Sequence, residues 1–307
     1  MWRLLSGVFL GWSLGANDTA NVFGTGVTTG IVRYRTAVLL TAVFVTLGAL
    51  LEGPKCMGTV GYLSHLLPMD AFYCTLASAI IMTILTYLAI PASASQAIIG
   101  AVIGAGLISI SADFAKLYKI VVCWVITPIG ALFAGYVLHR FLGFLLDMTV
   151  TSLTRRNSLY YIGILVTGSY GAYSLGANAV ANVTGVYVGS GMLSPDMASL
   201  IGGLSIASGV LTYSKKVMMT VGKGIVPLDP FSALVAVLAE AITLHVFTQI
   251  GVPVSSAQAI VGAVVGVGLV GDIQTVSGKM LMKIALGWVL TPVAAGVLTY
   301  AFIRLLM

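Results

Sequence analysis

The chain has 307 residues, of which 59% are hydrophobic and only 8% are charged, and its mean hydropathy is +1.06. A soluble domain is about 25% charged, so this composition excludes a soluble enzyme, a disordered protein and a secreted disulfide scaffold. The net charge is +6, but the basic residues lie in short gaps between long apolar runs. That distribution is typical of membrane topology signals rather than of a nucleic-acid surface. We therefore expect an integral protein of the lipid bilayer that binds no nucleic acid.

The N-terminal run from Leu4 to Leu14 follows Arg3 and resembles a signal peptide. A second copy of its motif lies in the middle of the chain, so we expect the run to belong to the mature protein. Cys56, Cys74 and Cys123 are too few and too scattered for a disulfide framework or a zinc site. We interpret them as apolar packing residues.

Ten segments are apolar enough to be membrane helices, which need about 20 mostly apolar residues. No linker between them is long enough to hold a soluble domain, so the sequence predicts an all-α, polytopic helical bundle. The segments cover approximately residues 4–29, 36–52, 70–90, 93–110, 117–146, 158–190, 197–213, 230–250, 255–271 and 280–306.

Five motifs recur in the same order, at offsets that drift only from 161 to 164 residues. Such self-similarity indicates that the chain contains two copies of one five-segment unit, which we place at 1–150 and 151–307. The paired motifs are Leu14-Gly15-Ala16-Asn17 with Leu175-Gly176-Ala177-Asn178, Lys55-x-Met57-x-Thr59-Val60-Gly61 with Lys216-x-Met218-x-Thr220-Val221-Gly222, Leu76-Ala77-Ser78-Ala79-Ile80 with Leu238-Ala239-Glu240-Ala241-Ile242, Pro91-x-Ser93-x-x-Gln96 with Pro253-x-Ser255-x-x-Gln258, and Trp124-Val125-x-Thr127-Pro128 with Trp288-Val289-x-Thr291-Pro292.

An odd number of segments per copy places the second copy upside down in the membrane, and re-entrant hairpins would keep the number odd. Ten basic residues then fall on one side and five on the other, which places both termini outside the cytoplasm of a multi-pass cell-membrane protein. Inverted repeats with broken helices and re-entrant hairpins are typical of secondary transporters, whose substrate sites lie near the midplane of the bilayer.

The segment Gly15–Asn21 interrupts the first span with small and polar residues, including Asp18. An Asp at membrane depth costs about 2.5–3.5 kcal/mol on insertion scales, so it must face protein, water or a cation. Glycine and the amides favour local unwinding, and the exposed carbonyl oxygens would suit Na⁺. Close helix packing by small residues, with Asn amides as bridges, is the alternative interpretation.

The two Pro-x-Ser loops at 91–96 and 253–258 lie between apolar segments and carry no charge. Proline ends the preceding helix, and Ser93 or Ser95 is a plausible N-cap for the next one. Each loop then points a helix N-terminus into the membrane, where free N–H groups and the positive end of the helix dipole favour an anion. Two tight loops on the membrane surface are the alternative.

Glu240 lies in the middle of an apolar run, where a carboxylate is a functional hypothesis by default. Its alternative role is a structural pair with His245, although a spacing of five residues faces poorly on a helix. Glu52 and Lys55 are better interpreted as a surface pair at the end of a span. Lys55 and Lys216 mark helix ends or draw anions toward two vestibules.

The Gly15–Asn21 motif with Gly24-Thr25, its degenerate copy, the two Pro-x-Ser loops and the 216–225 stretch together resemble the signature of the inorganic phosphate transporter (PiT) family. The resemblance covers nearly the whole chain. It implies an inverted-repeat transporter of phosphate, or in some members sulfate, coupled to Na⁺ or H⁺ and needing no other cofactor. It also implies anion-binding residues Ser93, Ser95, Gln96, Ser255, Ser256, Gln258 and Thr25, and cation-binding residues Asn17, Asp18, Asn21, Asn178, Asn182 and Glu240, with Na⁺ in the Asp18 region.

Two positions depart from the family pattern, which has a carboxylate where this chain has Ala179 and Ser78. Each half therefore retains one of two carboxylates. A site that has lost a carboxylate repels sulfate less, so sulfate is the alternative to phosphate. Other rivals are an anion channel, which needs no coupling ion, and an intramembrane enzyme, for which the sequence offers no nucleophile or metal motif. The glycine-rich faces are also compatible with a homodimer.

Overall fold

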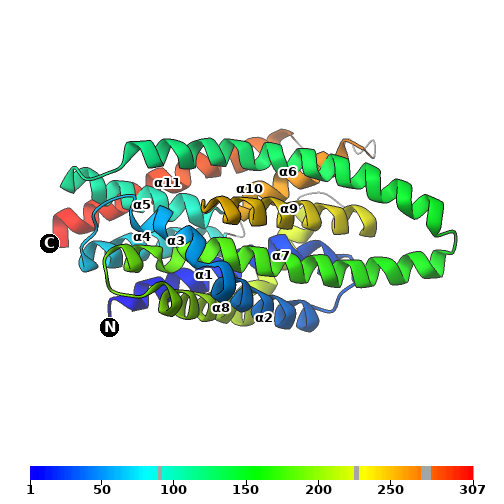
Figure 1. Cartoon of the computed structure of the whole chain (residues 1–307), viewed down its shortest axis with the longest axis horizontal. Helices are drawn as coiled ribbons and strands as arrows, with labels where there is room; N and C mark the ends of the chain where they lie inside the picture. The colour runs from blue at the N-terminus through cyan, green and yellow to red at the C-terminus, as the bar shows by residue number, and fades with distance from the viewer. Residues whose placement is uncertain (89–91, 225–227, 271–277, 307) are drawn as a thin grey trace.

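The computed structural model describes residues 1–88, 92–224, 228–270 and 278–306, and the regular structure in these ranges is helical (Figure 1). The predicted all-α, multi-pass bundle is therefore confirmed. Pro91 and Ile225, which belong to two of the sequence motifs, lie outside the described residues. In chain order the helices are α1 (Leu4–Thr28), α2 (Tyr34–Glu52), α3 (Pro54–Gly61), α4 (Pro68–Tyr87), α5 (Ala94–Ser109), α6 (Phe114–Thr149), α7 (Leu153–Gly189), α8 (Pro195–Gly224), α9 (Pro230–Ile250), α10 (Ser256–Gly268) and α11 (Gly278–Leu306).

One helix was not expected from hydropathy, because the second segment continues into the short helix α3 after a break at Gly53. Pro54 occupies the first turn of α3 and has no backbone N–H to continue the α2 hydrogen-bond ladder. The repeat-equivalent residue is Lys215, at an offset of 161 (215 − 54), which leaves the ladder intact. Helix α8 therefore runs unbroken to Gly224, well beyond the expected end at residue 213.

Each repeat packs its first two helices against those of the other repeat, α1 against α8 and α2 against α7. Four glycines allow these crossings, because a Cβ at any of them would collide with a backbone carbonyl oxygen of the facing helix. Every contact recurs at an offset of 161 residues, as a two-fold relation between the copies requires. The contacts are Gly15 with Ile206, Gly176 with Val45, Gly48 with Tyr173, and Gly209 with Trp12.

Equivalent helices of the two copies run in opposite directions. In Figure 1, α6 leaves the end at which the chain termini lie, whereas α11 returns to it, and α1 and α7 are opposed in the same way. This arrangement is consistent with an inverted repeat. Both termini lie at the same end of the long axis (Figure 1); their placement outside the cytoplasm remains a prediction.

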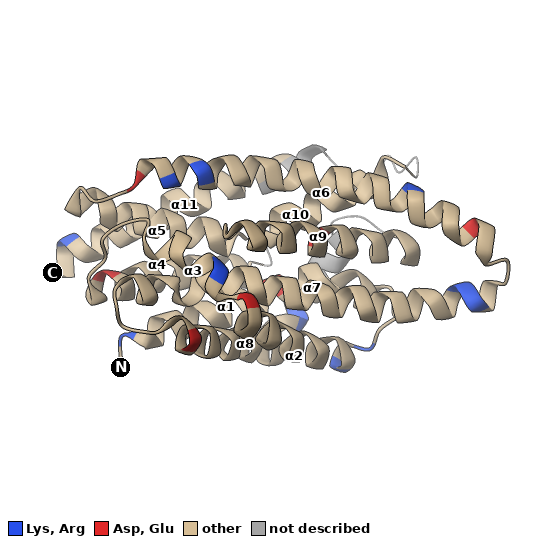
Figure 2. Ribbon diagram, in the orientation of Figure 1, with Lys and Arg blue, Asp and Glu red and all other residues tan. Residues whose placement is uncertain are grey.

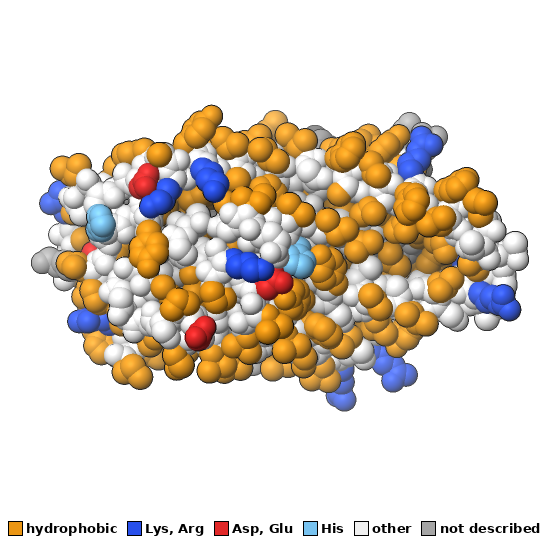
Figure 3. Space-filling view, in the orientation of Figure 1, with side chains coloured by type: hydrophobic (Ala, Val, Ile, Leu, Met, Phe, Trp, Pro, Cys, Tyr) orange, Lys and Arg blue, Asp and Glu red, His pale blue; other side chains and the backbone are white. Residues whose placement is uncertain are grey.

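The outer surface suits a hydrocarbon environment. Six helices within the described ranges are long and apolar enough to cross a membrane: α2, α4, α6, α8, α9 and α11. Large apolar side chains are exposed along α6 and α11, such as Phe133 (68% exposed) and Val289 (64%). Apolar side chains are spread over the whole face drawn in Figure 3, and many of the Lys and Arg residues in Figure 2 lie toward the two ends of the long axis, with a few near the middle.

Two helical hairpins, α4–α5 and α9–α10, turn inside this bundle. Helices α5 and α10 are apolar but have only 16 and 13 residues, which is too short to cross the membrane. In Figure 1 the turn between α9 and α10 lies well inside the length covered by α6 and α7. The hairpin helices α5 and α10 pack on α11 and α6 of the opposite repeat, and their N-cap residues Ser93 and Ser255 are buried.

Candidate functional site

The first motif is part of a continuous helix. Helix α1 extends unbroken from Leu4 to Thr28, so the expected unwinding at Gly15–Asn21 is wrong, and α7 is equally continuous through its copy. Gly15 is instead a packing residue against Ile206, and the Thr19 hydroxyl donates to the Gly15 carbonyl oxygen within the helix. The polar groups that this segment offers are therefore side chains rather than freed backbone carbonyls.

Asn17 of α1 holds the first hairpin turn in place. Its side-chain Nδ2 donates to Thr86 Oγ1 (3.0 Å), and its Oδ1 accepts from the backbone N–H of Ala92 (3.3 Å). One buried carboxamide thus ties the end of α4 to the chain that leads into α5. Two buried polar groups on either side of the turn, Thr86 Oγ1 and the Ala92 N–H, are thus satisfied from α1, as an apolar environment requires.

Asn178 of α7 holds the second turn in the same way. Its Nδ2 donates to Thr248 Oγ1 (3.0 Å) and to the Val252 carbonyl (3.2 Å), and its Oδ1 accepts from Val254 N–H (2.8 Å). Thr248 is the repeat equivalent of Thr86, at an offset of 162 (248 − 86). The two threonines were not singled out from the sequence, although the repeat offset would have identified them as a pair.

Each turn delivers a capped helix N-terminus to the interior. Ser93 caps α5 by accepting from Gln96 N–H (3.3 Å), and Ser255 caps α10 by accepting from Gln258 N–H (3.2 Å). These four side chains are 2–3% exposed, which disfavours the alternative of two surface loops. The first N–H groups of a helix have no intrahelical acceptor, so both N-termini offer donors to a buried anion. Ser95 completes the first loop through its hydroxyl contact with Ser93 (3.2 Å).

Asp18 lies where α1 meets the second hairpin. Its Oδ2 accepts a hydrogen bond from Ser256 Oγ (2.9 Å), which also accepts from Asn21 Nδ2 (3.2 Å). Glu240 approaches from α9, near enough to Asp18 for the two charges to interact. The structure therefore brings together four of the predicted site residues from both halves of the chain, and Asp18 and Glu240 are 3% and 0% exposed.

Several buried side chains of the predicted site carry an oxygen without a hydrogen-bond partner. Among the described residues, the side chains concerned are 0–3% exposed, and their free atoms are acceptors. A buried acceptor without a partner costs about 1–3 kcal/mol, and a cation is the ligand that satisfies several of them at once. The free atoms are Asp18 Oδ1, Glu240 Oε1 and Oε2, Asn182 Oδ1, Gln96 Oε1 and Gln258 Oε1.

Other predicted residues lie apart from this group. Thr25 is half-buried one helical turn beyond Asn21. His245 does not pair with Glu240; its Nε2 lies 3.2 Å from Glu52 Oε2. The expected Glu52–Lys55 pair is confirmed at 3.2 Å, and Figure 3 shows basic, acidic and histidine side chains adjoining on one face.

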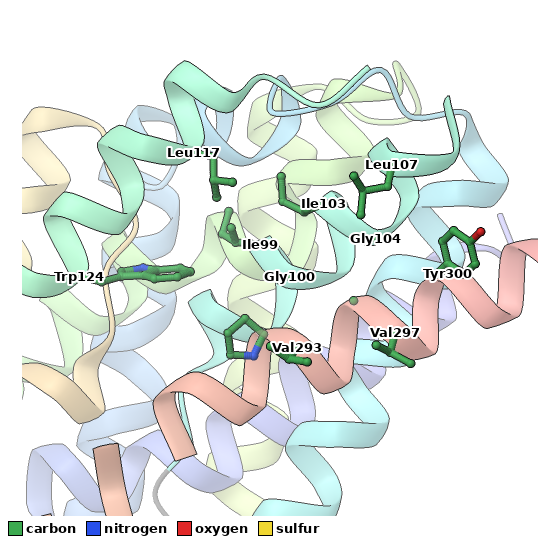
Figure 4. Close-up of a pocket in the computed structure, with 12 residues that line it drawn as sticks. Ile99, Gly100, Ile103, Gly104, Leu107, Leu117, Trp124, Val293, Val297 and Tyr300 are labelled. Atoms are coloured by element: carbon green, nitrogen blue, oxygen red, sulfur yellow. The ribbon is translucent and has the colours of Figure 1, made fainter. Parts of the chain in front are cut away.

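A cavity of about 430 Å³ lies away from the polar centre. It is an apolar groove between α5, α6 and α11, lined by residues such as Ile103, Trp124 and Val297 (Figure 4). Within the described ranges no group of three His, Cys, Asp or Glu side chains could hold a metal ion. The oxygen-lined centre is therefore the candidate site.

The family model for the phosphate transporter family matches residues 14–299, a range that includes all thirteen predicted site residues. The chain belongs to this family. It is 29% identical over 307 residues to a protein of Methanocaldococcus jannaschii named by inference as a phosphate permease, with 99% of this chain and 97% of the relative covered. It is 27% identical to the sulfate permease CysP of Bacillus subtilis, with 99% of this chain and 87% of the relative covered.

A solved structure named as the sodium-dependent phosphate transporter has the same fold, with a TM-score of 0.85, 22% identity and full coverage of both chains. The resemblance seen in the sequence motifs is thus confirmed, and the family supports phosphate transport.

Proposed function

We propose that the chain is a secondary transporter that moves inorganic phosphate across the cell membrane, coupled to Na⁺, by alternating access. The observation that carries the proposal is a pair of buried, capped helix N-termini, each attached to α1 or α7 by an asparagine, in a protein that also buries several oxygens without a hydrogen-bond partner. Donors from the helix ends suit an oxyanion, whereas hard oxygen ligands suit Na⁺.

The anion is held by the two hairpin turns in this proposal. Ser95 and Ser256 add hydroxyl donors beside the N-termini, and Gln96 and Gln258 add carboxamides on the first turn of α5 and α10. The cradle carries no positive side chain, so the anion's charge is balanced by helix dipoles and by the cation.

The cation is held by Asp18 and Glu240. Within the described part of the chain neither carboxylate forms an ion pair with Lys, Arg or His. A buried, unpaired carboxylate is costly, so cation binding stabilises the site and reduces its repulsion toward the anion. This linkage makes cation and anion binding mutually favourable, which is what symport requires.

In this proposal, the attachment of the hairpins explains how the site could open to the two sides of the membrane in turn. Asn17 and Asn178 join both turns to α1 and α7, and the hairpins also pack on α11 and α6 of the opposite repeat. A rocking motion of one set of helices against the other would open the site to either side in turn. The asymmetry of Lys and Arg supports an orientation with both termini outside the cytoplasm. The proposal also includes a homodimer formed through glycine-rich faces.

Uptake of radiolabelled phosphate and sulfate into proteoliposomes, with and without an inward Na⁺ gradient, tests the proposal. Phosphate uptake that needs Na⁺ supports it, and Gln96→Ala with Gln258→Ala should then abolish anion binding. Phosphate uptake driven by a proton gradient alone would replace Na⁺ by H⁺. Absence of phosphate uptake would contradict the proposed substrate.

Sulfate is the second candidate, because CysP is a sulfate permease and because Ala179 and Ser78 lack the carboxylates of the family pattern. Sulfate carries no proton at neutral pH that a carboxylate could accept. Sulfate uptake without phosphate uptake, in the same vesicles, would favour this candidate.

A further inference from the structure

Three oxygen-bearing residues of the site have repeat-equivalent residues that cannot replace them. Asp18 corresponds to Ala179, at the offset of 161 shared by α1 and α7 (179 − 18). At the hairpin offset of 162, Glu240 corresponds to Ser78 (240 − 78), and Ser256 corresponds to Ala94 (256 − 94).

The three oxygen-bearing residues share one corner of the molecule, because the copies exchange partners. Helix α1 packs on α9 and α10 of the second repeat, and α7 packs on α4 and α5 of the first. We name the first the charged corner, with Asp18, Glu240 and Ser256. The second is the neutral corner, with Ala179, Ser78 and Ala94. In the sequence each repeat carries one of the two carboxylates. In the fold, both carboxylates belong to the charged corner, because α1 of the first repeat packs on α9 of the second.

The neutral corner is buried but has little to offer a cation. Ala179, Ser78 and Ala94 are 0–4% exposed, and the Ser78 hydroxyl donates to the Cys74 carbonyl of its own helix (2.8 Å). Asn182 is the equivalent of Asn21 (182 − 21 = 161), and its Oδ1 has no hydrogen-bond partner in the described structure. One neutral amide oxygen does not offset the cost of dehydrating a buried cation.

Both carboxylates lie on one side of this comparison, whereas each loop keeps one hydroxyl besides its cap, with Ser95 opposite Ala257 (257 − 95 = 162) and Ser256 opposite Ala94. The turn anchors Asn17 and Asn178, the caps Ser93 and Ser255, and the glutamines Gln96 and Gln258 are equivalent in both sequence and contacts. The two halves of the anion cradle therefore share their anchors, caps and glutamines and differ only in which position carries the second hydroxyl, whereas both carboxylates lie on one side.

We propose that the chain binds a single coupling Na⁺, at the charged corner, and that the neutral corner binds none. This inference rests on the proposed function for its role in transport, but it also makes a claim about binding that is independent of transport. In transport, each anion then moves with one Na⁺, and the initial rate depends on Na⁺ with a Hill coefficient near one.

Direct binding of ²²Na⁺ to the purified full-length protein counts the sites without any uptake. We expect one Na⁺ per chain, lost in Asp18→Asn and retained in Ala179→Gly, which changes the neutral corner without adding a ligand. Two Na⁺ per chain, or one that survives Asp18→Asn, would overturn the inference. Zero Na⁺ would overturn it too, even where proton-driven phosphate uptake upholds the transporter. One bound Na⁺ with no anion uptake would uphold it while the proposed function fails.

Rebuilding the neutral corner provides the converse test. Ala179→Asp combined with Ser78→Glu and Ala94→Ser should raise the count to two Na⁺ per chain and the Na⁺-to-anion flux ratio to two. Ala179→Asp alone is the second variant if the triple variant does not fold. Folded variants that still bind one Na⁺ would show that charge at this corner does not determine the count, and would contradict the argument.

Discussion

The Oδ2 atom of Asp18 accepts a hydrogen bond from the Ser256 hydroxyl at 2.9 Å, across 238 residues of sequence. This contact joins a helix of the first repeat to the hairpin of the second, so the site exists only when both copies are folded together. A cation bound to Asp18 would therefore act directly on the turn that precedes α10. In the proposed function, the contact is the physical link between cation binding at Asp18 and the anion cradle.

Asp18→Asn should separate charge from shape at this contact. The carboxamide has the same size and its oxygen still accepts from Ser256, but the negative charge is lost. We expect the apparent Na⁺ affinity for uptake to fall by at least tenfold, which corresponds to about 1.4 kcal/mol, while the protein remains folded. Asp196→Asn, an exposed position in the first turn of α8, is the matched control. An unchanged Na⁺ dependence in Asp18→Asn would remove Asp18 from the cation site.

Asn178→Ala should loosen the second hairpin turn. The change leaves Thr248, the Val252 carbonyl and Val254 N–H without their side-chain partner, and each buried group left unpaired costs about 1–3 kcal/mol. We expect a lower apparent melting temperature in detergent and weaker anion binding. Asn157→Ala replaces an exposed asparagine on the same helix and should change neither. Equal effects of the two variants would argue against the anchoring role.

The repeat, the hairpin turns and the capped N-termini could be predicted from the sequence, because they depend on local residue types that recur at fixed offsets. Whether Gly15–Asn21 is helical or unwound could not be predicted, because small residues favour both unwinding and close helix packing. The structure shows close packing, with the Ile206 carbonyl directly opposite Gly15. The closeness of Asp18 and Glu240 could not be predicted from the sequence either. A repeat search aligns equivalent positions but does not say which helices of the two copies meet.

Gly176→Ala should destabilise the crossing of α7 and α2. A Cβ at Gly176 would collide with the Val45 carbonyl oxygen, which belongs to a helix backbone and cannot move alone. Overpacking of this kind costs about 1–3 kcal/mol, so the apparent melting temperature should fall. Gly130→Ala is the matched control, because nothing lies within 4 Å of a Cβ there, and alanine is the better helix former by up to about 1 kcal/mol. We expect the apparent melting temperature to fall in Gly176→Ala and to rise slightly in Gly130→Ala. A fall in both variants would contradict the packing explanation.

Glu52 should couple energetically to Lys55. Its carboxylate lies 3.2 Å from Lys55 Nζ and accepts from the Tyr173 hydroxyl (2.9 Å), and its side chain is 17% exposed against 44% for Lys55. We expect Glu52→Gln and Lys55→Met each to lower the apparent melting temperature, and the double variant to lose less than the sum. Contacting residues of this kind show interaction energies of about 0.5–3 kcal/mol, and the exposure of Lys55 places this pair toward the low end. Strict additivity across the four proteins, measured in one detergent at one pH, would show that the pair contributes nothing beyond its separate contacts.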